Sequence, residues 1–189
     1  FLIARGFIIT GLGRRIAFNF IRAFGSKTLG LAYAIEASDL VIAPATPSNT
    51  ARAGGILYPI VRSLCSTFGS EPGGTARKIG SYLMLMEYQG VVVTSAMFMT
   101  SCAINPLIVE LAKKTANVSL SWGTWALAAS VPGLISLIVV PYLIYKLYPP
   151  EVKETPQASE MAHAELEKMG PMSRQEKMMI AVFVVILTL

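Results

Sequence analysis

The sequence has few charged residues and few of the side chains that carry enzyme chemistry. Only 14% of its 189 residues are Asp, Glu, Lys or Arg, whereas a soluble domain carries about 25%. It has one histidine and two cysteines, and it contains no Gly-Xaa-Ser-Xaa-Gly, no Walker loop and no Cys/His metal set. These absences argue against an enzyme, and we expect no catalytic residue and no bound metal centre.

What the sequence has instead is apolar chain, at 53% hydrophobic residues. The net charge of +5 comes from cations that lie between apolar segments, which is typical of cytoplasmic loops and not of a nucleic-acid interface. We therefore expect an all-α polytopic membrane protein whose surroundings are the lipid bilayer, with no nucleic-acid partner. Both ends fall inside apolar runs, so we also expect a fragment of a longer chain.

Interruptions of the apolar pattern divide the chain into eight segments. The loops that hold most of the cations are expected on the cytoplasmic side, with residues 113–121 outside. The expected segments are the end of a membrane helix (1–10), an interfacial amphipathic helix (13–27), a re-entrant hairpin (28–64), a cytoplasmic loop (65–78), a broken transmembrane helix (79–112), a transmembrane helix (121–148), a second cytoplasmic loop (149–177) and the start of a truncated transmembrane helix (178–189).

The hairpin is predicted from its tip, residues 43–55. Pro44 and Pro47 stop a helix there, because proline has no N–H group and its ring crowds the preceding turn. Ser48, Asn49 and Thr50 follow, three polar side chains between two apolar arms that are each shorter than the about 30 Å of a bilayer core. Polar groups at membrane depth are costly unless they bind something. We therefore expect the tip to bind a solute.

A second interruption divides the segment 79–112. Thr100, Ser101, Asn105 and Pro106 again combine hydroxyls, an amide and a proline. Two short, interrupted hydrophobic segments are the best sequence indication of a transporter site at the bilayer midplane. Glu87 lies before this break, where a structural ion pair is a better expectation than a proton carrier.

The polar segments carry their own signals. A helical projection of 13–27 places Arg15, Asn19 and Arg22 on one face and Phe24 on the apolar opposite face, which favours a helix lying at the membrane surface. Thr155 is expected to cap a soluble helix that begins at Pro156. The run 173–176, Ser-Arg-Gln-Glu, predicts a capping box at the start of the last helix.

With these features in view, the chain resembles the divalent anion:sodium symporter family. The resemblance rests on Ser48-Asn49-Thr50 in the pattern Ala-Pro-Xaa-Xaa-Pro-Ser-Asn-Thr-Ala-Arg-Xaa-Gly-Gly, and the runs 2–8, 77–84 and 168–173 extend it. It is closest to the branch of bacterial citrate/succinate and tartrate/succinate antiporters and plastid 2-oxoglutarate/malate translocators. It implies an inverted-repeat, elevator-type transporter, usually a homodimer. The intact tripeptide favours a bacterial inner membrane, with the plastid inner envelope as the alternative.

The resemblance also implies roles for the tip and the break. Ser48, Asn49 and Thr50 would bind the carboxylates of succinate, malate, citrate, tartrate or 2-oxoglutarate, and Ser48 and Asn49 would border a cation site completed by backbone near Ser101. Thr100, Asn105 and Pro106 would support the break. Pro44 replaces a serine found in sodium-coupled members, which favours anion exchange over the alternative, sodium symport. A channel and a membrane enzyme remain further alternatives.

Overall fold

The computed structural model describes residues 2–188, with side-chain burial given for residues 5–185, and within them the chain is helical. The only extended pairing in that part is an isolated bridge between Lys27 and Glu154. In chain order the elements are α1 (Leu2–Thr10), α2 (Leu12–Phe24), α3 (Thr28–Ile42), the 3-10 turn η1 (Ala43–Ala45), α4 (Asn49–Arg52), the π-helical turn η2 (Ala53–Leu57), α5 (Tyr58–Thr67), α6 (Gly80–Met97), the 3-10 turn η3 (Met99–Ser101), α7 (Ile104–Ala116), α8 (Trp122–Leu147), α9 (Pro156–Met169) and α10 (Arg174–Thr188).

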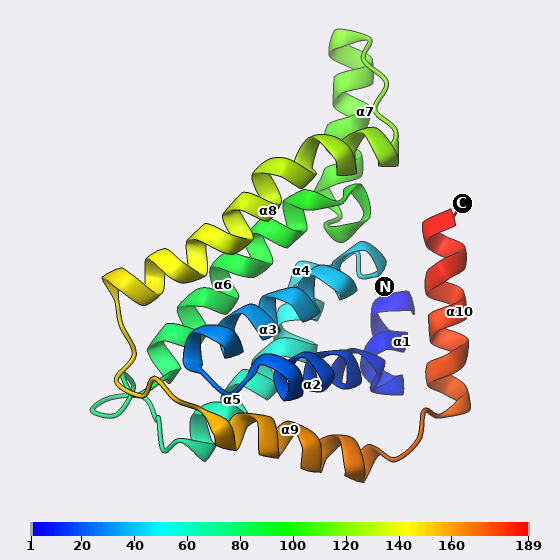
Figure 1. Cartoon of the computed structure of the whole chain (residues 1–189). Helices are drawn as coiled ribbons and strands as arrows, with labels where there is room; N and C mark the ends of the chain where they lie inside the picture. Colours follow the sequence, from blue (N-terminus) through cyan, green and yellow to red (C-terminus); the bar gives the residue numbers. More distant parts are fainter. Residues whose placement is uncertain (1, 189) are drawn as a thin grey trace.

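The segment predicted as a hairpin consists of α3, a turn and a returning arm. α3 gives way to η1 at Ala43, immediately before Pro44, and regular helix resumes only at Asn49. The returning arm, α4 to α5, contains a π-helical turn at 53–57 and comes back toward α9 (Figure 1). It extends to Thr67, three residues into the predicted loop 65–78. The chain therefore reverses where the two prolines deprive the backbone of N–H donors.

The predicted broken helix is divided slightly earlier than expected. α6 ends at Met97, η3 follows, and α7 begins at Ile104. Asn105 and Pro106, expected in the break, therefore lie in the first turn of α7. A proline is tolerated there because N–H groups of the first turn have no intrahelical partner to lose.

Within residues 2–188, two helical segments are long and apolar enough to cross a membrane, over Thr28–Ala45 and Trp122–Leu147. The second, α8, is mostly exposed, and Leu127 on its outer face is 76% exposed. Its inner face contacts α6 and α3, and the indole groups of Trp122 and Trp125 donate to Thr100 Oγ1 and the Ala96 carbonyl at 3.1 and 2.9 Å. Apolar exposure on this scale is what a lipid-facing helix requires.

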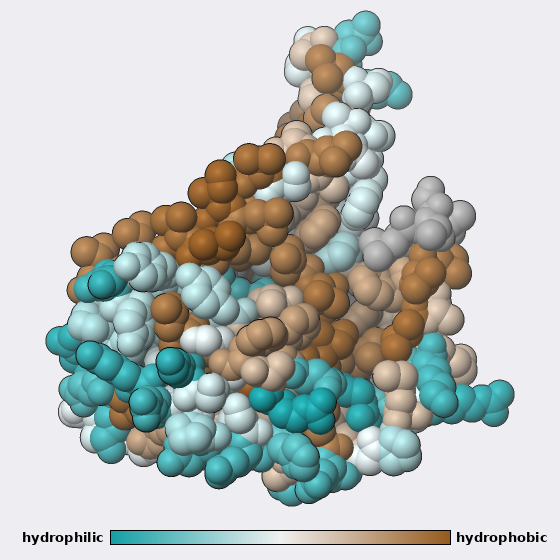
Figure 2. All heavy atoms as spheres, in the orientation of Figure 1, coloured by the Kyte–Doolittle hydropathy of each residue, from teal (hydrophilic) through white to brown (hydrophobic). Residues whose placement is uncertain are grey.

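The two cation-rich loops that are predicted to share one side of the membrane lie against each other. The backbone N–H groups of Glu151 and Val152 donate to the carbonyls of Arg77 and Lys78 at 3.1 and 3.0 Å. Figure 2 shows hydrophilic side chains gathered over this end and over α9, whereas hydrophobic side chains cover α8. α7 lies at the opposite end of the molecule (Figure 1).

The amphipathic helix α2, predicted to lie at the membrane surface, packs against other helices along one face. Its buried face comprises Ala17, Phe18 and Ile21, and Phe24, predicted on the apolar face, is 58% exposed. α9 packs along α2, and Arg15 forms an ion pair with Glu176, with Nε and Oε1 2.6 Å apart. The basic face is therefore partly engaged by protein, because a partner 161 residues away supplies a carboxylate that helical periodicity cannot reveal.

One of the two predicted helix caps is confirmed. Ser173 Oγ accepts from the Glu176 N–H at 3.1 Å, and Glu176 Oε2 accepts from the Ser173 N–H at 2.7 Å, which is the reciprocal pattern of a capping box. Thr155 precedes α9 but makes no side-chain cap, since its hydroxyl donates to the Gly25 carbonyl at 2.7 Å. Thr155 thus joins α9 to the end of α2.

Glu176 is expected to stabilise the protein by joining α10 to α2 through its ion pair with Arg15. The Glu176→Gln substitution keeps the shape but removes the charge that faces Arg15, and both side chains are largely buried, at 2% and 12% exposure. We expect a loss of about 2 kcal/mol, measured as a lower unfolding midpoint of the full-length protein in detergent. Glu167→Gln is the control, because Glu167 is 70% exposed in a surface pair. An equal shift in both variants would contradict the expectation.

Candidate functional site

The Ser-Asn-Thr tip is arranged by a side-chain cap. Ser48 Oγ accepts from the Ala51 N–H at 3.2 Å, which fixes the start of α4. Asn49 Oδ1 accepts from the Thr50 N–H at 2.9 Å. The amide nitrogen of Asn49 has no hydrogen-bond partner among the described residues. Ser48 and Asn49 are half-buried and Thr50 is exposed. The tip therefore offers an amide N–H₂ group and a hydroxyl to a ligand.

Cavities lie on two sides of Asn49. One, of about 340 Å³, separates the tip from the break and is lined by Pro47, Ser48, Asn49, Cys102, Ala103 and Ile104. The other, of about 330 Å³, lies along α6 and is lined by Asn49, Thr50 and Glu87, among others. The structure thus brings the predicted tip and the predicted break to opposite walls of one cavity, with Asn49 common to both cavities.

A further cavity, of about 200 Å³, lies at the polar loop after α5 and includes neither the tip nor the break. It contains the exposed pair Arg62 and Glu71, whose Nη2 and Oε2 atoms are 2.5 Å apart. The hydrogen bond from Arg62 holds the pKa of Glu71 below its usual value. Because this pair already satisfies both charges, we place the candidate site at the tip.

Thr100 connects the break to the tip directly. Its hydroxyl donates to the Pro44 carbonyl at 2.7 Å and accepts from the Trp122 indole at 3.1 Å. Pro44 therefore lies at the end of α3, and its carbonyl accepts the hydrogen bond that holds Thr100 of the break. Pro106 makes no such contact and lies within α7.

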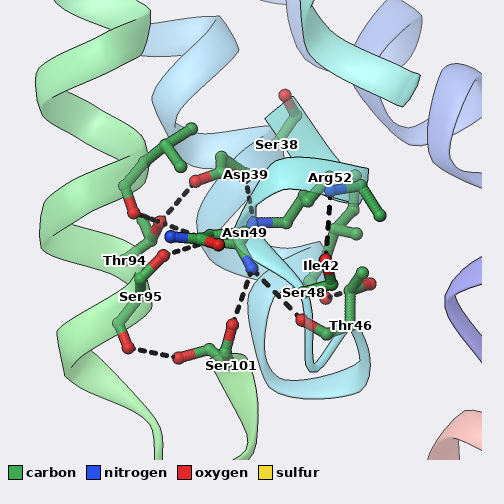
Figure 3. Close-up of polar contacts among 12 residues, drawn as sticks. Ser38, Asp39, Ile42, Thr46, Ser48, Asn49, Arg52, Thr94, Ser95 and Ser101 are labelled. Carbon is green, nitrogen blue, oxygen red and sulfur yellow. Dashed lines mark hydrogen bonds and ion pairs between the residues drawn. The ribbon is translucent and has the colours of Figure 1, made fainter. Parts of the chain in front are cut away.

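Arg52 is the centre of the polar network shown in Figure 3. Its side chain is fully buried, and Nε lies 2.5 Å from Asp39 Oδ1. Nη1 donates to the carbonyls of Thr46 and Ser101, each at 3.3 Å, and Nη2 donates to the hydroxyls of Thr94 and Ser95, each at 3.0 Å. A guanidinium has five N–H donors, and here all five have acceptors. One side chain therefore joins both arms, the tip, the end of α6 and the break.

Polar side chains also satisfy the carbonyls that the break leaves open. A helix end leaves four C=O groups without intrahelical partners. Ser101 Oγ lies 2.7 Å from the carbonyls of both Ser95 and Phe98 and donates its one hydrogen to either of them. The two N–H groups of Asn105 Nδ2 donate to the same two carbonyls at 2.7 and 2.8 Å. Asn105 thus supports the break from within α7.

The groups expected to hold a cation have protein partners in this structure. Ser48 Oγ caps α4, and Ser101 Oγ is directed to the backbone. The Ser101 carbonyl, which the resemblance assigns to the cation, accepts from Arg52 Nη1. A guanidinium charge therefore lies on the oxygen that a metal cation would be expected to contact.

The sequence missed the Arg52 network and misjudged Glu87. The one signal in the sequence was two opposite charges, Asp39 and Arg52, on the two arms of one predicted hairpin. Glu87 was expected to form an ion pair, but within residues 5–185 it has none; it is 7% exposed and lines the second cavity. Asp39, the nearest candidate for charge interaction with Glu87, is itself an acid and is paired with Arg52.

Comparison with known proteins identifies relatives over the whole chain. Residues 1–189 match the model of the sodium:sulfate symporter transmembrane region. The chain is 57% identical to YflS of Bacillus subtilis over 100% of its length, 53% identical to the chloroplastic dicarboxylate transporter 1 of Arabidopsis thaliana over 96%, and 43% identical to the L-tartrate/succinate antiporter of Escherichia coli over 97%. It spans 40%, 33% and 38% of these three proteins.

Proposed function

This chain belongs to the divalent anion:sodium symporter family of membrane transporters, and from that premise we propose that its Ser-Asn-Thr tip forms half of a site for small di- or tricarboxylates. The observation that carries the proposal is the cavity between tip and break, with the unpartnered amide of Asn49 in its wall. A neutral amide and hydroxyl can bind a carboxylate and release it again, as a transport cycle requires.

The substrate class rests on the tip and on the relatives. Asn49 supplies N–H donors, Thr50 supplies an exposed hydroxyl, and Ser48 fixes the turn that presents them. The names of all three relatives refer to dicarboxylates: malate for YflS, dicarboxylates as a class for the Arabidopsis protein, and tartrate and succinate for the Escherichia coli antiporter. We propose that succinate, malate, citrate, tartrate and 2-oxoglutarate are the candidates.

We propose anion exchange as the mode of transport, with sodium-coupled symport as the alternative. Arg52 supports exchange, because its buried guanidinium supplies a fixed positive charge at the carbonyls of Thr46 and Ser101. A mobile cation would have to share those oxygens with Nη1 of Arg52, whose guanidinium is already paired with Asp39. Pro44, which has no hydroxyl to offer a cation, supports the same reading.

The wider architecture is proposed from the family. We propose an inverted-repeat, elevator-type transporter that acts as a homodimer in a bacterial inner membrane, or alternatively in a plastid inner envelope. Arg52 supports a rigid moving unit, since it ties both hairpin arms to the break through buried contacts. A channel is the further alternative, and saturation of uptake distinguishes a carrier from it.

Exchange and sodium coupling can be separated in proteoliposomes that contain the full-length protein. We expect uptake of labelled succinate to require a dicarboxylate inside the vesicles and to be unchanged when sodium is replaced by choline. The expected uptake saturates, unlike the current through a channel. Uptake into empty vesicles that depends on an inward sodium gradient would overturn exchange in favour of symport.

A further inference from the structure

Glu36 is an acid on α3 that the proposed site does not use. It is 3% exposed, and neither carboxyl oxygen has a hydrogen-bond partner in the described part of the chain. It faces Gly90 of α6 so closely that a Cβ atom at that position would lie 2.9 Å from Glu36 Oε1. The absence of a side chain at Gly90 therefore makes the space that the carboxyl group occupies between the two helices.

The hydroxyl groups around Glu36 are directed elsewhere. Tyr33 and Tyr82 lie within electrostatic range of the carboxyl group. Their hydroxyls donate instead to carbonyls of α8, Tyr33 to Ile138 at 2.7 Å and Tyr82 to Pro141 at 3.2 Å. An ionised carboxylate at Glu36 would therefore have no donor to replace the water it has lost.

No positive charge among the described residues compensates Glu36 either. Asp39 follows it by one helical turn on α3, and the one guanidinium in this core, Arg52, has all its donors engaged, the first by Asp39. Burial of an unpaired carboxylate is so unfavourable that such a group takes up a proton instead. The titratable groups that interact electrostatically with Glu36 are Tyr33 and Asp39 of α3 and Tyr82 of α6. Tyr142 and Tyr145 of α8 interact with those two tyrosines, and Glu87 and Arg52 interact with Asp39.

We propose that Glu36 is a proton-binding site between α3 and α6, and that its proton must be in place for the transporter to work. With Glu36 neutral, Asp39 keeps its ion pair with Arg52. With Glu36 ionised, a second negative charge lies beside that pair and opposes the packing of α3 on α6. Because Arg52 fixes the tip next to Asn49, the protonation of Glu36 acts on the carboxylate site through the hairpin.

The direction in which pH changes transport follows from the negative charge that Glu36 acquires when it loses its proton. The proton is bound at low and neutral pH and is lost as pH rises, so transport is expected to fall toward alkaline pH. This consequence rests on the proposed carboxylate transport, whereas the protonation itself does not. The two are therefore tested by separate measurements.

Infrared difference spectroscopy of the full-length protein in nanodiscs tests the protonation. We expect the wild type at neutral pH to show the C=O stretch of a buried carboxylic acid and Glu36→Gln to lack that component. Glu110→Gln is the matched control, because Glu110 is exposed in a surface pair with Lys114, and it should keep the band. A band that is unchanged in Glu36→Gln would overturn the proposal.

The second measurement compares exchange at neutral and alkaline pH. We expect wild-type exchange to fall by about tenfold for each pH unit above the point at which Glu36 loses its proton, and Glu36→Gln to remain active there. Identical pH profiles for the two proteins would overturn the coupling, and absence of transport at every pH would overturn the proposed function alone.

If Glu36→Gln fails to fold, the protonation of Glu36 is tested on the wild type by reaction with dicyclohexylcarbodiimide, followed by mass spectrometry. Modification of Glu36 at neutral pH supports a bound proton there, and absence of modification contradicts it.

Discussion

The Arg52→Met substitution is expected to destabilise the protein by about 4 kcal/mol, because it leaves Asp39 as an unpaired buried carboxylate. Asp39 is 2% exposed at its side chain, and its carboxylate accepts from Arg52 Nε, its one charged partner in the described structure, and from the Thr94 hydroxyl. The substitution also leaves the hydroxyls of Thr94 and Ser95 and two backbone carbonyls without their donor. The unfolding midpoint of the full-length protein in detergent measures the loss.

Two further variants identify the cause of the Arg52 effect. Arg62→Met removes an arginine from an ion pair that is 40% and 47% exposed, and we expect little change because such pairs are screened by water. Asp39→Asn combined with Arg52→Met removes the buried charge altogether, so it should recover part of the stability. If Arg52→Met is as stable as Arg62→Met, Arg52 does not hold the hairpin to the break.

The Asn49→Ala substitution is expected to abolish the main polar contact to substrate while the fold is kept. The only hydrogen bonds of the Asn49 side chain in the described structure are to its neighbour Thr50, so removing it disturbs little. Loss of a hydrogen bond to a charged group costs about 2 kcal/mol, which is roughly 30-fold in affinity. Succinate binding to the purified full-length protein, measured by calorimetry, should weaken by that order.

Asn19→Ala provides the control for Asn49. Asn19 is an exposed asparagine on α2 whose amide donates to the Arg15 carbonyl at 2.8 Å, far from both cavities at the tip. Its loss should leave succinate affinity at the wild-type value. Undiminished binding by Asn49→Ala would remove the tip from the carboxylate site.

Local chemistry explains which parts of the fold the sequence could predict. Pro44 and Pro47 stop a helix whatever surrounds them, so the turn after α3 follows from the chain itself. The capping box at Ser173 likewise depends on four successive residues. Pro106 shows the limit, because a proline is compatible both with a break and with the first turn of the helix after it.

Contacts between distant residues explain what the sequence could not predict. Asp39 and Arg52 are 13 residues apart, and Ser101 is 49 residues from Arg52, so their meeting depends on how the arms pack against α6. Arg15 and Glu176 likewise meet only through packing, and their largely buried ion pair involves part of the predicted basic face. The site residues Ser48, Asn49 and Thr50 came from a local motif, whereas the network that positions them came from packing alone.

The most direct test of the proposed site uses Cys102, which lines the cavity opposite Asn49. Cys102 is half-buried, whereas Cys65 is 1% exposed and serves as an internal control that should not react. We expect succinate to slow the alkylation of Cys102 by a maleimide several-fold in the full-length protein, and we expect this protection to vanish in Asn49→Ala. If Cys102 reacts at the same rate with and without each candidate carboxylate, the cavity between tip and break is not the substrate site.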